Sequence, residues 1–165
     1  MAEETSINTS HIGWGLFAAG MGAFIIAGTS GLLGIDMHPT EGTPQWIGIL
    51  AGAIFLAGGF AVVLQSLPAA KPRPDGSLSP DAPRWVRGVS LLLGLTIAGG
   101  LTAIAYWVGF GPGERHFSGG LFFLSAHAND MLGRVVFAFG AVLASFMFLA
   151  FLIVGVRQLV GRNKT

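Results

Sequence analysis

The chain contains no cysteine. It therefore has no thiol for disulfide exchange, for iron–sulfur ligation or for a cysteine zinc site. A quinone reductase that depends on a dithiol is excluded for the same reason.

Charge is scarce as well. Asp, Glu, Lys and Arg make up 10% of the 165 residues, whereas apolar residues make up 52% and the mean hydropathy is +0.68. Soluble domains carry about 25% charged residues. So few charges cannot cover a water-exposed surface, and we expect lipid to surround much of the chain. The net charge of +1 gives no electrostatic basis for binding nucleic acid.

Four long apolar runs are almost free of charged residues. Each reaches the roughly 20 residues that an α-helix needs to cross about 30 Å of hydrocarbon. Helices pair their own backbone groups in lipid, and the runs lack the alternation of a membrane β-barrel. The sequence predicts an all-α, polytopic membrane protein, a four-helix up-down bundle formed as one domain by residues 1–165. The predicted helices are about 12–35, 45–67, 85–110 and 131–160.

Three connections join these runs. The first, about 36–44, is short and acidic, and the second, 68–84, is rich in Pro and polar residues. We expect the second to be an extended, solvated loop. The third, 111–130, is the longest.

Basic residues are unevenly distributed among the connections. Seven lie around 68–84 or near the C-terminus: Lys71, Arg73, Arg84, Arg87, Arg157, Arg162 and Lys164. The other side has Arg115 and Arg134 among several acids. The positive-inside rule then predicts that both termini and 68–84 are cytoplasmic. Two Glu and no basic residue precede the first run, so we expect a retained helix rather than a signal peptide.

Small residues recur at four-residue spacing within the runs. Gly48 and Gly52 form one such pair, and Gly140 and Ala144 form another. Small residues let helix backbones approach closely in lipid. The pairs predict tight helix packing, with a face left for another copy or another protein.

Ionisable residues gather in the connections on the predicted outer side. They form an outer polar cluster of Glu114, Arg115, Asp130 and Arg134. Asp130 and Arg134 have the spacing and order of a favourable helical ion pair. Two interpretations stay open, an interfacial anchor with local pairing or a functional site that docks a partner or lines a polar pocket.

Three histidines on that side are weak candidates for a metal site. His38, His116 and His127 lie in connections together with carboxylates, which is a donor set for divalent metals. No compact ligand motif is present, and solvated loop histidines are the simpler interpretation. No histidine lies at membrane depth, so no haem or other cofactor is predicted.

The stretch GPGERHFS follows a predicted helix that ends in Trp-Val-Gly-Phe, residues 107–110. With four apolar runs and a basic, Pro-rich middle connection, it resembles a group of uncharacterised bacterial inner-membrane proteins. The resemblance implies a bacterial inner-membrane location. It carries no known activity and no functional residues.

Three functional hypotheses follow. The first is a non-enzymatic protein, either an accessory subunit of a larger membrane complex or a small homo-oligomer. The second is a small transporter or channel, and the third is a metal-dependent enzyme with an outer-face site. Apart from the lipid bilayer, the expected partner is another copy or another membrane protein.

Overall fold

The computed structural model describes residues 9–34, 43–70, 78–79, 81–112 and 125–160. Four α-helices account for most of them, and all four are long and apolar enough to cross a membrane. The predicted helical membrane architecture is confirmed at that level. The helices are α1 (Thr9–Thr29), α2 (Gln45–Gln65), α3 (Arg84–Phe110) and α4 (Ala126–Val160).

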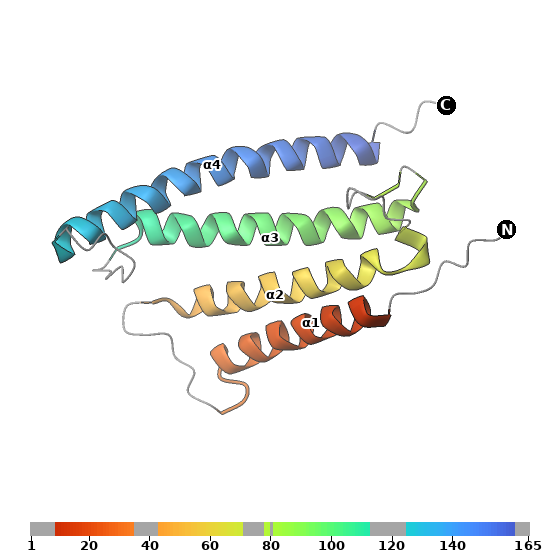
Figure 1. The fold of residues 1–165 in the computed structure, drawn as a ribbon, viewed down its shortest axis with the longest axis horizontal. Helices are drawn as coiled ribbons and strands as arrows, with labels where there is room; N and C mark the ends of the chain where they lie inside the picture. The colour runs from red at the N-terminus through yellow and green to blue at the C-terminus, as the bar shows by residue number, and fades with distance from the viewer. Residues whose placement is uncertain (1–8, 35–42, 71–77, 80, 113–124, 161–165) are drawn as a thin grey trace.

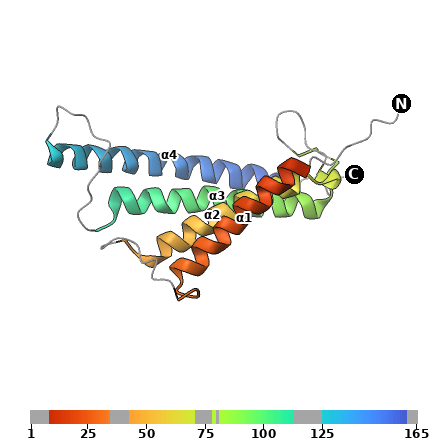
Figure 2. The same ribbon diagram turned by 60° about the horizontal axis from the view of Figure 1, so that its bottom comes forward.

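The helices lie side by side in chain order (Figure 1). Among the described residues, extensive contacts join only consecutive helices, α1 with α2, α2 with α3, and α3 with α4. Figure 2 shows that α1 and α2 are inclined relative to α3 and α4. The fold is therefore a row of two hairpins, more open than the tight bundle that the small-residue spacing suggests.

Glycines bring α1 and α2 together. A Cβ built on Gly59 would meet the backbone of Gly15 and Ala19, and one built on Gly52 would meet Gly22 and Ile26. Toward the other end of α1, Thr29 lies against Gly48. Because positions rise along α1 as they fall along α2, the two helices are antiparallel. Backbones this close gain dispersion energy that larger side chains would prevent.

The first helix ends at Thr29, six residues before the predicted end at Ile35. Gly31 has a φ of 77°, and its N–H donates to the Gly28 carbonyl, while the N–H of Leu32 donates to Ala27. This pair of bonds is the Schellman helix ending, which favours glycine at the left-handed position. The prediction placed the helix end too late because the residues beyond the turn are apolar. A glycine that ends a helix does not lower the mean hydropathy of the run.

Bulky side chains meet glycines where α3 packs on α4. Phe151 lies against Gly94, and Leu91 lies against Gly155. Nearer the other end, a Cβ on Gly109 would meet the backbone of Ala138 at 2.7 Å. These contacts also run in opposite directions along the two helices, so the second hairpin is antiparallel too.

A small apolar core closes the end where α2 leads into α3. Leu64, Ala70, Ala82 and Val86 are buried together, and Leu78 packs against them. Pro68–Ala70 form a short 3-10 helix. The flanks of the 68–84 connection are thus packed rather than solvated, which corrects the expectation of a wholly extended loop. The apolar residues at the two ends of this connection are buried against the end of α2 and the start of α3.

The second and third helices begin close to their predicted starts. α2 ends at Gln65 rather than Leu67, because Pro68 disfavours helical geometry in the residue before it. α3 begins at Arg84, after Pro83 at its N-cap position.

Candidate functional site

Tryptophans mark two levels along the row of helices. Trp46 and Trp107 form an edge-to-face pair with ring centroids 6.4 Å apart, joining the start of α2 to the end of α3. Trp14, beside Gly15, and Trp85, beside the buried Val86, lie toward the opposite end. Val63 of α2 contacts Gly15 and therefore marks the level of Trp14 along α2. The stretch of α2 from Trp46 to Val63 is about 26 Å long, at 1.5 Å per residue. That separation suits interfacial tryptophans on both sides of a hydrocarbon layer about 30 Å thick.

α4 extends well beyond the level of the Trp46–Trp107 pair. Gly109, two residues after Trp107, lies beside Ala138, which is twelve residues after the start of α4 at Ala126. Twelve residues of helix span about 18 Å. The first three turns of α4 therefore project past the ends of α2 and α3.

The projecting turns carry two members of the outer polar cluster. Asp130 and Arg134 are both half-buried on α4, and each takes part in an interaction within the protein. Their place beyond the tryptophan level keeps both charges outside the most apolar part of the helix. The other two members, Glu114 and Arg115, lie outside the described residues.

Ser125 sets the start of α4. Its Oγ accepts a hydrogen bond from the N–H of Ala128 at 3.3 Å, which is the usual bond of a helix N-cap. With this cap the helix begins at Ala126, whereas the start was predicted at about Met131. The prediction was wrong by five residues because it assigned the polar segment 127–130 to the third connection.

Only one of the three histidines that were candidates for a metal site lies among the described residues. His127 is exposed in the first turn of α4, whereas His38 and His116 lie outside the described residues. Within the described part of the chain, no three His, Asp or Glu side chains gather closely enough to hold a metal ion.

The predicted packing residues divide into two kinds of environment. Gly48 and Gly52 face α1, at Thr29 and Ile26 respectively. On α4, Gly140 is exposed, with no neighbouring atom within 4 Å of the position of a Cβ, and Ala144 is half-buried.

Two close contacts of the first hairpin were not identified from the sequence. Gly59 of α2 lies against both Gly15 and Ala19, which are one turn apart on α1. The seven-residue spacing from Gly15 to Gly22, with Ala19 between, was the available signal.

Hydroxyl groups inside the apolar spans bond to their own helices. Thr96, Thr102 and Ser145 each donate to the carbonyl four residues earlier, at 3.0, 2.8 and 2.8 Å. At the end of α1, Gln45 Nε2 instead donates across the hairpin to the Thr29 carbonyl at 2.7 Å.

Comparisons with known proteins give no relative. Neither a protein-family model, nor a curated protein, nor a solved structure matches this chain. The functional argument therefore depends on the residues and on their arrangement.

Proposed function

We propose that this chain is a four-span protein of the bacterial inner membrane, arranged up and down with both termini in the cytoplasm. The antiparallel contacts within the α1–α2 and α3–α4 hairpins support the alternation. The basic residues around 68–84 and near the C-terminus support the cytoplasmic side. The resemblance of the GPGERHFS stretch supports the bacterial location.

Its proposed role is that of a non-catalytic accessory subunit in a larger membrane complex, or of a protomer in a small homo-oligomer. The open row of helices carries this proposal. In the most apolar 18-residue stretch of α3, only 6% is buried within the chain, and the same share is buried in the corresponding stretch of α4. Lipid covers such faces in a monomer, but small residues on them allow another helix to approach closely. Gly140 is such a residue, exposed on α4.

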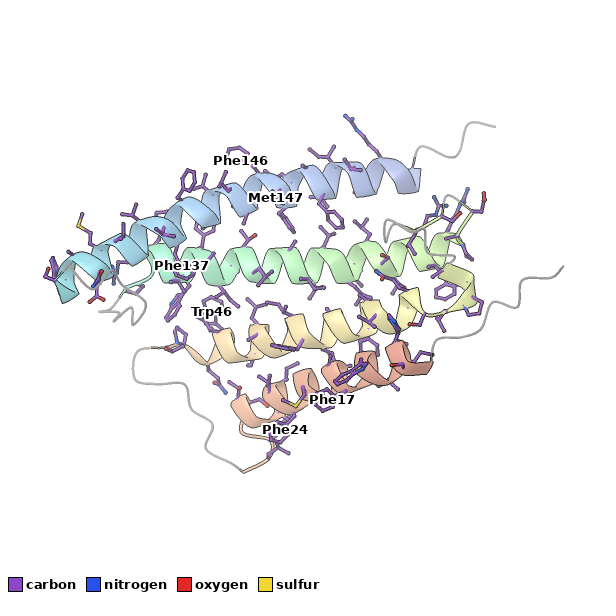
Figure 3. All side chains as sticks on the ribbon, viewed as in Figure 1. Phe17, Phe24, Trp46, Phe137, Phe146 and Met147 are labelled. Carbon is purple, nitrogen blue, oxygen red and sulfur yellow. The ribbon has the colours of Figure 1, made fainter. Side chains whose placement is uncertain are left out.

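The two helices at the ends of the row each expose several large apolar side chains. Figure 3 shows Phe17 and Phe24 on α1, and Phe146 and Met147 on α4. Phe146 and Met147 are 67% and 73% exposed. A partner helix would cover these side chains, so both edges of the row are proposed contact surfaces.

Native mass spectrometry of protein extracted gently from its own membrane tests this role. We expect an assembly heavier than the 17.1 kDa chain, containing either further copies or a second protein. Chemical crosslinking in intact membranes before extraction controls for loss of a partner in detergent. A bare monomer in both experiments, with full thermal stability, would contradict the subunit proposal.

A further inference from the structure

α1 carries a second set of glycines on the side that is turned away from α2. Cβ atoms built on Gly15 and Gly22 would strike the backbone of α2, so these two glycines face that helix. Gly13 and Gly20 each stand two residues earlier, which is about 200° around the helix at about 100° per residue. Neither has an atom within 4 Å of its Cβ position. Gly13 and Gly20 therefore form two open glycine notches on the outward face of α1.

Paired notches of this kind are specific to α1. Among the glycines of the described helices, α1 is the one helix with two open Cβ positions, whereas α2, α3 and α4 have one each, at Gly58, Gly88 and Gly140. Glycine weakens a helix relative to alanine, and within the chain these positions gain no contact that offsets the loss. The two notches are seven residues apart, which is the period at which parallel helices keep the same faces together.

Two phenylalanines form a ridge beside the notches. Phe17 and Phe24 follow Gly15 and Gly22 by two residues, so their side chains also point away from α2 (Figure 3). They are 63% and 47% exposed. Trp14 packs edge to face on Phe17, with ring centroids 6.1 Å apart, and restrains its ring. The ridge lies four residues after the notches, or about 40° around the helix.

This arrangement is complementary to itself. Two copies with the same orientation in the membrane have parallel α1 helices, and a two-fold axis between them turns the ridge of each copy toward the notches of the other. Phe17 lies between Gly13 and Gly20 along the helix, so its ring meets the gap between those glycines in the second copy. Phe24 lies in the same way between Gly20 and Ala27.

Phenylalanine already packs on glycine elsewhere in this chain. On the α3–α4 side of the row, Phe151 lies against Gly94, and Phe148 lies 3.3 Å from the Cβ position of Gly99. The outward face of α1 presents the same two components, and both are open in the single chain.

The exposed area on this face matches the requirement of a stable dimer. Five large side chains lie on the half of α1 that is turned away from α2: Trp14, Leu16, Phe17, Met21 and Phe24. From their exposed fractions they present about 500 Å², at about 150–250 Å² for a whole aromatic side chain and less for Leu and Met. Two copies that covered this face would bury about 1,000 Å² in all, the size that a specific interface needs.

We propose that the outward face of α1 binds α1 of a second copy of this chain, with Phe17 and Phe24 of each copy seated at the glycine notches of the other. The inference rests on the proposed function, and it commits to a second copy as the partner and to α1 as the contact.

Gly20→Leu fills the central notch and tests the contact. Because the Cβ position is open in the single chain, the variant should not lower the melting temperature of the protomer. It should weaken dimerisation at least about five-fold, the lower limit for an overpacked contact. Phe17→Ala should also weaken the dimer. Gly58→Leu is the matched control, since it fills an open position on α2 and should leave the dimer unchanged. Sedimentation equilibrium in detergent micelles gives the dissociation constants.

Disulfide crosslinking in isolated membranes identifies the partner, because the chain has no cysteine of its own. Gly20→Cys should give a crosslinked dimer of this chain, and Gly58→Cys should not. A Gly20→Leu dimer as tight as the parent, equal crosslinking of the two cysteine variants, or a Gly20→Cys crosslink to a different protein would overturn the inference and leave the subunit role standing. A chain that is monomeric both in membranes and in detergent would contradict the proposed function as well.

Discussion

Gly59→Ala should destabilise the protein, whereas the same change at the neighbouring Gly58 should not. A Cβ at residue 59 would strike the backbone of Ala19 and Gly15, and backbone atoms cannot rotate away. Overpacking of this kind costs about 1–3 kcal/mol. At residue 58 there is no atom within 4 Å of a Cβ, so that variant should be at least as stable as the parent, because alanine has the higher helix preference.

The adjacent positions make this comparison specific. Both substitutions replace glycine by alanine in the middle of α2, so they change intrinsic helix preference equally. Unfolding in mixed micelles, followed by circular dichroism, gives the free energies. Equal stability of the two variants would show that α1 and α2 do not pack through Gly59.

Gly109→Leu should separate α3 from α4 at the end of the second hairpin where Gly109 lies beside Ala138. A leucine side chain at this position would have to displace the backbone of Ala138, which lies 2.7 Å from the Cβ position. We expect a loss of stability of at least about 2 kcal/mol, toward the upper part of the range for overpacked sites. Thermal aggregation followed by size-exclusion chromatography measures the loss.

Gly140→Leu on α4 is the matched comparison for Gly109→Leu. In a single chain it meets no neighbour, so the stability of isolated protomers should be unchanged. If α4 also packs against another copy or another protein through Gly140, the variant should lower the mass of the native assembly. An equal loss of protomer stability in both variants would contradict the described packing of α4.

Hydropathy predicted the number and approximate position of the helices because a span needs a long run of apolar residues. It failed at helix ends, where local bonding decides. The Gly31 turn ends α1 inside an apolar run, and the Ser125 cap extends α4 into a polar one. Neither effect changes mean hydropathy.

The small-residue pattern identified which residue types pack, but not which faces they share. Gly48 and Gly140 occupy similar sequence contexts, yet one lies against α1 and the other is exposed. The choice depends on how each helix is rotated, which contacts between distant residues determine. The outer polar cluster remains a prediction as a whole, because two of its four members lie outside the described residues.

Single-cysteine labelling tests the four-span arrangement most directly, and the absence of natural cysteine makes the background clean. His11 and His127 are both exposed, the first near the start of α1 and the second near the start of α4. A membrane-impermeant maleimide should label His127→Cys only in right-side-out vesicles and His11→Cys only in inside-out vesicles. Labelling of both variants from the same side would contradict the proposed arrangement.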